Sequence, residues 1–277
     1  MVKQALLEDR GVVEIAGPDA VTFLHNLVTN DIASLGAGEA RFAALLAPQG
    51  KILFDFLVFA RDRDEGRALL LDCPRSLAAD LVRRLGMYKL RARATIADRS
   101  QEIASLALWD TIERPEVAAL ALARDPRSPA LGWRALVPRG AAETGAREAY
   151  DALRIGARVP EGGVDFAYGD AFPHEANMDR LAGVDFTKGC FIGQEVVARM
   201  KHRGAVRKRV TAYRAQGPAP APGTPVMAGE LELGATGSRI GDRGLALIRL
   251  DRLADATAAG VTPRAGGVAL AFEPAGD

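Results

Sequence analysis

The sequence predicts an α+β fold rather than a doubly wound parallel sheet. Helical and strand patterns alternate irregularly along the chain, and consecutive strand patterns are joined by short turns, which is typical of antiparallel hairpins. From about residue 217 the composition shifts to short strand patterns with dense glycine, which favours a small β-barrel or sandwich. With 277 residues, of which 48% are hydrophobic, the chain is long enough for two or three domains with a sizeable core.

The first half of the chain gives the clearest patterns. The β-branched run Gly11–Ala16 predicts a strand, and Pro18 then opens a helix whose apolar residues recur at helical spacing as far as Val28. Two further strands, Arg41–Leu46 and Lys51–Ala60, flank a four-residue turn that contains proline and glycine. The remaining patterns are strands at Arg67–Leu71, Glu102–Asp110 and Gly132–Val137, and a helix that follows Pro74.

The second half begins with an amphipathic helix predicted at Ala142–Ile155. The following segment, Gly156–Lys188, is rich in glycine, proline and aspartate and shows few clear elements. A stretch of that length without structure of its own is usually functional. A helix is then predicted at Gln194–Arg203. The short strands expected in the C-terminal barrel are Pro225–Met227, Gly234–Ser238, Gly244–Arg249 and Val268–Phe272.

The formal net charge is only +1, so the molecule has no global field that would hold nucleic acid or an anionic membrane. The first ten residues lack the apolar run of a signal peptide, and their two acidic residues argue against an organellar transit peptide. The apolar stretches are too short to span a bilayer. These observations predict a soluble, cytoplasmic protein without a membrane partner, and we expect it to be a monomer.

The two cysteines, Cys73 and Cys190, are too few for a disulfide framework and have no partners at zinc-ligand spacing. No metal site is therefore predicted. An iron–sulfur cluster usually takes four thiolates from one chain, so this chain would not hold a cluster alone. The sequence also has no nucleophilic triad signature and no phosphate-binding glycine loop.

Cys190 stands directly before a predicted helix start. Gly189 permits backbone angles that other residues avoid, and Gly193 is a suitable N-cap. Unsatisfied N–H groups at a helix start, together with Lys188, would favour the thiolate, which is the nucleophilic and metal-binding form. The alternative is that Cys190 is a small apolar core residue, and that is our prediction for Cys73, at a strand-to-helix junction.

A basic run from Arg199 to Arg209 contains seven potential cations and no acid. Such a run is usually a solvated face, but it could hold an anionic ligand such as a polyglutamate tail. Contact with RNA phosphates is a weaker interpretation, because no aromatic residues are interleaved for base stacking. Three polar residues beside apolar runs, Asn30, Asp31 and Asp55, would face either solvent or an internal cavity.

The segment Lys188–Glu195, with the adjacent Arg199 and the continuation Arg203–Arg209, resembles the signature of the YgfZ/Iba57 family. Three further blocks in the expected order also resemble it: Phe23–Ile32, Gln49–Asp55 and Pro173–Asn177. The family is similar in fold to the aminomethyltransferase (T-protein) of the glycine cleavage system. The resemblance implies a ring of three domains around a cavity that admits tetrahydrofolate: a discontinuous domain (1–46 and 150–204), an inserted α+β domain (47–149) and a C-terminal β-barrel (205–277).

The resemblance also implies a function, namely tetrahydrofolate-dependent assembly or repair of iron–sulfur clusters in client enzymes, including tRNA-modifying ones. Implied partners are folate and iron–sulfur carrier or client proteins, with a cluster shared transiently with a partner. Cys190 and Lys188 would carry the chemistry. The residues expected to bind the cofactor are Asn30, Asp31, Asp55, Gly189, Gly193, Gln194, Glu195 and Arg199.

Two departures from the T-protein pattern bear on the alternatives. A T-protein carboxylate that helps to hold the pterin follows a Leu-Arg-Ile segment, and here that position is Gly156. The candidate for the T-protein's catalytic aspartate is Asp80, which is one position out of register. Both departures disfavour a folate-dependent aminomethyltransferase, which stays the first alternative. A non-enzymatic RNA-binding accessory protein is the second.

Overall fold

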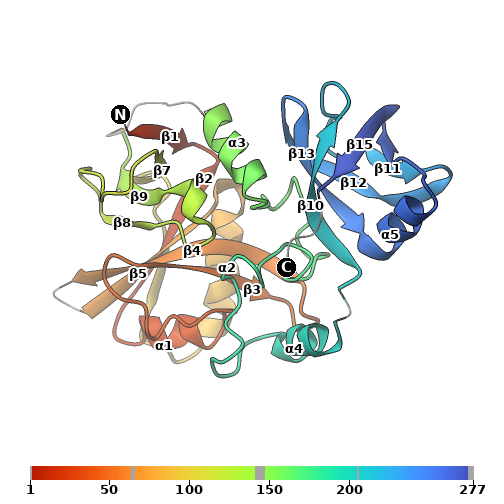
Figure 1. Ribbon diagram of the computed structural model, residues 1–277. Helices are drawn as coiled ribbons and strands as arrows, with labels where there is room; N and C mark the ends of the chain where they lie inside the picture. The colour runs from red at the N-terminus through yellow and green to blue at the C-terminus, as the bar shows by residue number, and fades with distance from the viewer. Residues whose placement is uncertain (1, 64–65, 141–146, 205, 274–277) are drawn as a thin grey trace.

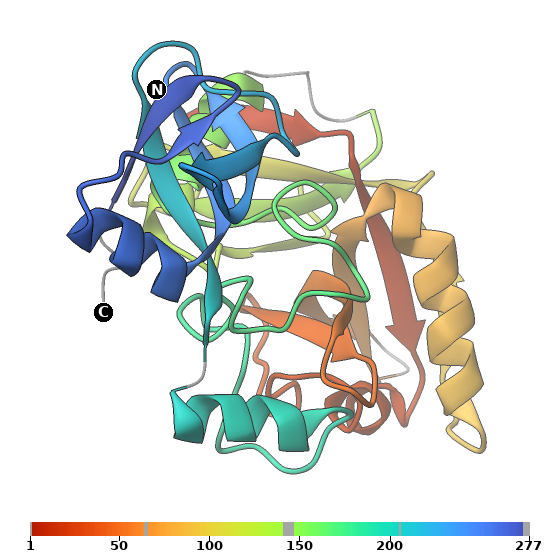
Figure 2. The ribbon, with the colours of Figure 1, turned by 90° about the vertical axis from the view of Figure 1, so that its right-hand side faces the viewer.

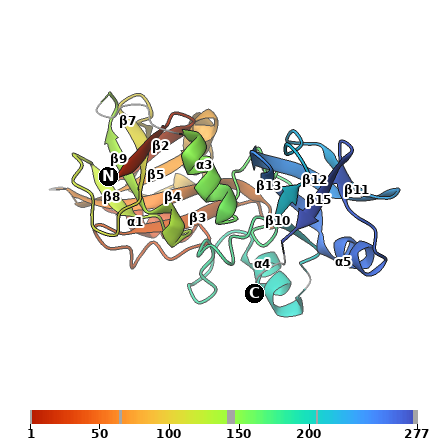
Figure 3. The same cartoon turned by 45° about the horizontal axis from the view of Figure 1, so that its top comes forward.

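The computed structural model describes residues 2–63, 66–140, 147–204 and 206–273. Within them lie two antiparallel sheets and a closed barrel (Figure 1), so the predicted α+β class with a C-terminal β-barrel is confirmed. The barrel stands beside the two sheets, and a long segment with α4 (Gln194–Arg203) leads from the sheets into it (Figure 3).

The first sheet has five strands in the order β3-β4-β5-β2-β6. The apolar spacing of the two helices α1 and α2 places Leu24, Leu81 and Leu85, all fully buried, against one face of this sheet. The bounds are β2 Arg10–Ala16, α1 Ala20–His25, β3 Ala40–Leu46, β4 Ile52–Arg63, β5 Gly66–Pro74, α2 Ala78–Lys89 and β6 Thr95–Asp98, with a short 3₁₀ turn η1 at Arg75–Leu77.

The second sheet has the order β1-β7-β9-β8 and packs on the other face of the first. Its edge strand β1 was not predicted, because a five-residue strand that pairs with β7 about a hundred residues later leaves little local signal. The bounds are β1 Lys3–Leu7, β7 Ile103–Trp109, β8 Ala121–Arg124, η2 Pro129–Leu131, β9 Trp133–Pro138 and α3 Arg147–Gly156. The part of the predicted helix at 142–146 lies outside the described residues.

The segment between α3 and α4 contains no helix or named strand among its described residues, as its composition predicted. It is fixed instead by hydrogen bonds to the loop after α1 and to the first sheet. Thr29 Oγ1 donates to the Gly183 carbonyl at 2.7 Å, and the Ile52 N–H donates to the Ala171 carbonyl at 2.9 Å. The segment is therefore an ordered cover over the end of the sheet.

The barrel closes in the order β10-β13-β12-β11-β14-β15. Its helix α5 was not predicted, since Arg249 at the N-cap makes no side-chain capping bond and no proline or capping residue marks the start. The bounds are β10 Lys208–Ala215, β11 Pro225–Ala228, β12 Leu231–Ile240, β13 Arg243–Arg249, α5 Leu250–Ala258, β14 Arg264–Ala265 and β15 Val268–Phe272.

The expected domain boundaries differ in how they relate to the sheets. The boundary after residue 46 lies in the turn between β3 and β4, which pair with each other in one sheet. The boundary near 205 comes shortly before β10, the first barrel strand. By pairing alone, residues 10–98 form one sheet and the barrel forms another unit.

Candidate functional site around Cys190

Cys190 is exposed at the tip of a loop that ends at α4. A side chain added at the neighbouring Gly189 would meet nothing within 4 Å, so the loop tip is open. Cys73 is the opposite case: it is fully buried in the core, and burial raises the pKa of its thiol to about 12. Cys190 is therefore the accessible thiol of the described chain.

The segment before Cys190 is held by Asp185 and Lys188. Asp185 Oδ1 accepts hydrogen bonds from the Thr187 N–H (2.7 Å) and the Lys188 N–H (3.1 Å), which forms a compact turn. The Lys188 ammonium donates to the carbonyls of Val28 (2.7 Å) and His25, at the end of α1. Among the contacts of the described residues, none joins Lys188 to the thiol, so its visible role is to fasten the loop to α1.

Burial lowers the pKa of Lys188 to about 8, and the nearby Asp31 and Asp185 only partly oppose that effect. The lysine thus binds fewer protons in the folded than in the unfolded state between about pH 8 and its ordinary value of 10.5.

We expect the free energy of unfolding of the wild type to rise with pH across that window, relative to Lys188→Met. Chemical denaturation of both proteins at pH 7 to 11 measures the difference. Stability curves that stay parallel would show that the ammonium is not desolvated as the structure has it.

The segment after Cys190 is fixed by two glycines. Gly193, at the N-cap of α4, has a φ of 79°, and a Cβ there would lie 2.7 Å from the Ala47 carbonyl oxygen. Gly50 has a φ of 80°, and a Cβ there would lie 2.9 Å from Val196 Cβ. The turn between β3 and β4 is thus seated against the first turn of α4, which brings two of the predicted blocks, Gln49–Asp55 and Lys188–Glu195, into contact.

The side chain of Gln194 closes this end of the loop by accepting a hydrogen bond from the Phe191 N–H at 3.2 Å. Glu195 and Arg199, also predicted to face a ligand, form an exposed i,i+4 ion pair of 2.6 Å on the surface of α4. A pair this exposed adds little to stability.

The basic run does not form one continuous face. Lys201 stacks over the Phe186 ring, with its ammonium 3.8 Å from the ring centroid. Arg209 is buried and binds both carboxylate oxygens of Asp179, at 2.9 and 3.0 Å. Two of its cations are therefore committed to internal contacts, which disfavours a continuous phosphate-binding stripe.

The three polar residues predicted near a cavity lie in different environments. Asn30 is buried and donates to the carbonyls of Phe42 (2.7 Å) and Ala182 (2.6 Å), although it also lines a hollow of about 450 Å³ beside the Cys190 loop. Asp31 caps a turn, and hydrogen bonding from Ser34 lowers its pKa.

Asp55 is buried in β4, where it accepts a hydrogen bond from the Tyr168 hydroxyl. Burial raises the pKa of Tyr168, and the adjacent carboxylate raises it further. Asp55 also lines a small cavity of about 30 Å³ between the two sheets. Of the three polar residues, Asp55 is the one that lies between the two sheets.

A network of buried charges that sequence reasoning missed surrounds this cavity. Arg134, only 2% exposed, binds Asp72 at 2.8 Å, and Asp72 also binds Arg10 at 2.7 Å. Asp125 binds Arg127 at 2.7 Å. No sequence signal identified the link between Arg134 and Asp72, because these residues are 62 positions apart and meet only when both sheets have formed.

Arg127 also borders a second hollow, of about 300 Å³, between the sheets and the barrel. Three more arginines line it: Arg158, Arg180 and Arg209. Arg158 has a φ of 55°, an uncommon conformation for a residue with a side chain, and such strain is often kept at functional positions. Three of these arginines already have partners, since Arg127, Arg158 and Arg209 pair with Asp125, Glu273 and Asp179, so an anionic ligand here would have to displace one of these carboxylates.

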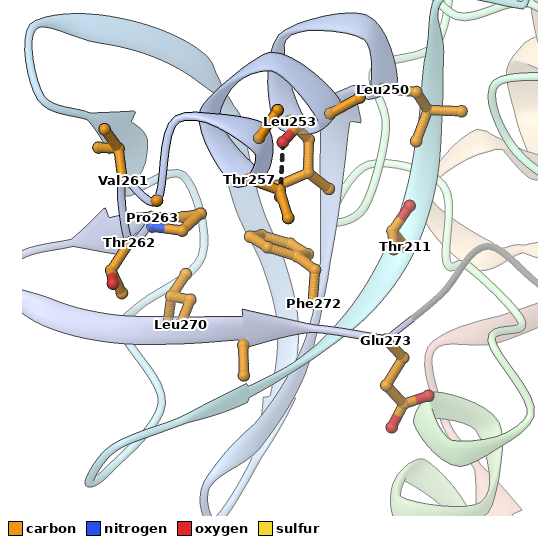
Figure 4. A pocket seen from close by; sticks show the side chains of 14 residues that line it. Thr211, Leu250, Leu253, Thr257, Val261, Thr262, Pro263, Leu270, Phe272 and Glu273 are labelled. Carbon is orange, nitrogen blue, oxygen red and sulfur yellow. Dashed lines mark hydrogen bonds between the residues drawn. The ribbon is translucent and has the colours of Figure 1, made fainter.

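A larger apolar hollow, of about 900 Å³, lies between α5 and the end of β15 (Figure 4). Leu253, Val261 and Phe272 line it, and Thr257 there donates to the carbonyl of Leu253 at 2.8 Å (Figure 4). It belongs to the barrel and contains none of the predicted site residues.

The candidate for a transferase carboxylate lines none of the hollows described above. Asp80 lies on the exposed side of α2 and pairs with Arg83 at 2.8 Å.

No described helix is both long and apolar enough to cross a membrane. The part of the chain that the structure describes also holds no group of three acidic, histidine or cysteine side chains suited to a metal ion.

Comparisons with known proteins identify the class of fold to which the protein belongs. Residues 7–110 match the family model of the GCVT N-terminal domain, and residues 207–275 match that of the C-terminal β-barrel domain of CAF17. The structure is similar to the glycine cleavage system aminomethyltransferase T of Bartonella henselae, with a TM-score of 0.76 over 99% of this chain and 85% of that one. At 18% identity this likeness shows the fold alone, and it confirms the predicted T-protein fold.

The particular family follows from sequence relatives. The chain is 36% identical to the mitochondrial iron–sulfur cluster assembly factor IBA57 of Mus musculus, over 78% of this chain and 67% of that protein. It is 34% identical to IBA57 of Homo sapiens, over 85% and 72%. The chain belongs to the IBA57 family, as the signature around Cys190 predicted.

The predicted cytoplasmic location is contradicted by the same relatives, whose names point to the mitochondrion. That prediction rested on the composition of the first residues and on the shortness of the apolar stretches, and neither feature identifies a compartment.

Proposed function

We propose that this protein supports iron–sulfur cluster assembly by presenting Cys190 as one thiolate ligand of a cluster that a partner protein also holds. The observation that carries the proposal is an exposed thiol at the tip of a loop that is fixed on both sides. The relatives' names, which describe iron–sulfur cluster assembly factors, support the same role.

The chemistry requires a partner. A cluster usually needs four protein ligands, and one chain offers a single accessible thiol because Cys73 is buried. On binding iron, the Cys190 thiol releases its proton and the sulfur forms the bond, with no change in oxidation state. The other ligands then come from a carrier or client protein, and we propose that tRNA-modifying enzymes are among the clients.

Replacing Cys190 with alanine is expected to abolish the rescue of a cluster-dependent enzyme in cells that lack the protein. Cys73→Ala is the matched control, because it removes a thiol that has no access to a partner. Enzyme activity and protein abundance are measured in parallel. Full rescue by Cys190→Ala at normal abundance would falsify the proposal.

We propose that the protein also binds tetrahydrofolate, independently of the role of Cys190. Two hollows differ in how well they would fit this ligand: the small cavity beside Asp55 and the 300 Å³ hollow beside Arg158. The cavity beside Asp55, at about 30 Å³, holds about one water molecule and does not fit a pterin as it stands. The 300 Å³ hollow reaches the lower range for small-molecule sites, and its arginines suit the carboxylates of a folate glutamate. Arg158 would hold one of those carboxylates by exchanging its partly exposed ion pair with Glu273 for a pair with the ligand.

Titration with tetrahydrofolate is expected to give saturable binding that weakens at least ~10-fold in Arg158→Asn, since one charge-assisted contact is lost. Asparagine tolerates the positive φ of this position, so the variant should fold. Arg243→Asn, on the exposed surface of the barrel, is the control. Absence of saturable binding to the wild type would remove folate while leaving the role of Cys190 standing.

A further inference from the structure

The turn after α2 contains a strained leucine that the fold does not explain. The Ala92 N–H donates to the Lys89 carbonyl at 2.7 Å, and Leu90 between them has φ 41° and ψ −102°. These angles belong to the first central position of a type II′ turn, where glycine is the usual residue. The Leu90 side chain is nevertheless 90% exposed, so it gains no burial in return for the strain.

Met87, three residues earlier, is 67% exposed. Tyr88 and Ala92 turn inward and pack on the core of the first sheet. The turn is thus anchored by two side chains while two large aliphatic ones face solvent. Single exposed hydrophobic residues are ordinary, but strain retained to display one is a reason to look for a function.

The segment that carries the two aliphatic side chains is basic. Residues 81–94 contain five basic residues and no acidic one. Arg83 pairs with Asp80, and Arg93 pairs with Asp19. For the other three, no ion pair with another described residue is found: Arg84, Lys89 and Arg91. We call Met87, Leu90 and these three cations the α2-end patch.

The α2-end patch lies on the same side of the molecule as Cys190. In Figure 2 the lower end of α2, the short helix α1 and the helix α4 follow one another along the lower edge of the molecule. The contacts agree: the Arg93 N–H donates to Asp19 at the start of α1, and Lys188 donates to Val28 just beyond the end of α1. The region of α1 therefore contacts both the segment that follows the patch and the segment that precedes Cys190.

We propose that the α2-end patch docks an acidic surface, with an apolar centre, of the partner protein that shares the cluster with Cys190. This inference rests on the proposed function. The three cations complement acidic side chains, and Met87 and Leu90 supply the desolvated centre that such interfaces need. RNA is a poorer fit, since Tyr88 is packed inward and offers no stacking face. Two aliphatic side chains are also too little apolar surface for a membrane anchor.

The test uses calorimetric titration of the full-length protein with an acidic iron–sulfur carrier protein in its cluster-free form. Leu90→Gly is expected to keep or raise the thermal midpoint, because it relieves the turn, and yet to weaken binding at least ~10-fold. Reversing the charges with Arg84→Glu, Lys89→Glu and Arg91→Glu is expected to weaken binding by a similar factor and to remove its salt dependence. Ile112→Ser, at a position 88% exposed on another surface, and Arg243→Glu are the controls and should bind like the wild type.

Binding within about twofold of the wild type by both patch variants, or no binding by the wild type, would overturn the inference. Preference of the wild type for an RNA oligomer or for anionic vesicles over the carrier would overturn it as well. Cys190→Ser is titrated in the same series. It should dock normally and fail in cluster delivery, so normal delivery by this variant would reject the proposed function without touching the docking result.

Discussion

Replacing Arg134 with leucine is expected to lower the free energy of unfolding by about 3–5 kcal/mol, the usual effect of removing one partner from a buried ion pair. Arg134 joins the two sheets: it stands in β9 and binds Asp72 of β5 at 2.8 Å. Leucine would fill part of the volume but leave the fully buried Asp72 with one cation fewer. Urea denaturation followed by circular dichroism measures the loss.

The difference between wild type and variant should depend on pH. Burial alone would raise the pKa of Asp125, but Arg127 and Arg134 outweigh it and lower that pKa to about 2. A carboxylate with a lowered pKa stabilises the fold above its ordinary pKa of 3.8, and that contribution disappears as the pH falls through about 2. The cost of Arg134→Leu should therefore shrink between about pH 4 and pH 2.

Arg83→Leu is the matched control, because Arg83 also pairs with an aspartate but is exposed on α2. Arg83→Leu is expected to change the free energy of unfolding by no more than about 0.5 kcal/mol. Equal losses in the two variants would mean that the buried network does not join the sheets in solution.

The sequence predicted the elements whose signals are local. A run of β-branched residues identified β2, helical apolar spacing identified α1, and the proline and glycine between β3 and β4 marked the turn that separates these two strands. What remained hidden depends on contacts between distant residues. Asp72 pairs with Arg134, and β1 pairs with β7. A single sequence does not show which distant residues or strands will pair.

The candidate site also has features that the sequence predicted and features that only the structure shows. A recognisable string identified Cys190 as the residue of interest, and the structure adds that the thiol is exposed. Lys188 was predicted to aid the thiol electrostatically, whereas its ammonium binds the carbonyls of His25, the last residue of α1, and of Val28, just beyond it. A side chain as long as lysine can reach several neighbours, so the closeness of Lys188 to Cys190 in the sequence did not show which groups its ammonium contacts.

Gly193→Ala is expected to cost roughly 2–5 kcal/mol, since a left-handed backbone adds about 1–2 kcal/mol and overpacking about 1–3 kcal/mol. The new Cβ would lie 2.7 Å from the Ala47 oxygen and 3.0 Å from Gly50 Cα. Both contacts are to backbone atoms of the turn that supports α4, so no side chain can rotate away. Either the turn or the start of α4 must move.

Such movement would reach the thiol, because only two residues separate Gly193 from Cys190. We therefore expect Gly193→Ala to lower the thermal midpoint, to speed amide exchange in the first turn of α4 and to impair cluster delivery. Gly189→Ala is the control: it stands beside the same cysteine, but its Cβ would meet nothing within 4 Å and its φ is not positive. Should the two variants behave alike, the Cys190 loop would be held by its hydrogen bonds to α1 and not by the contact between the two glycines.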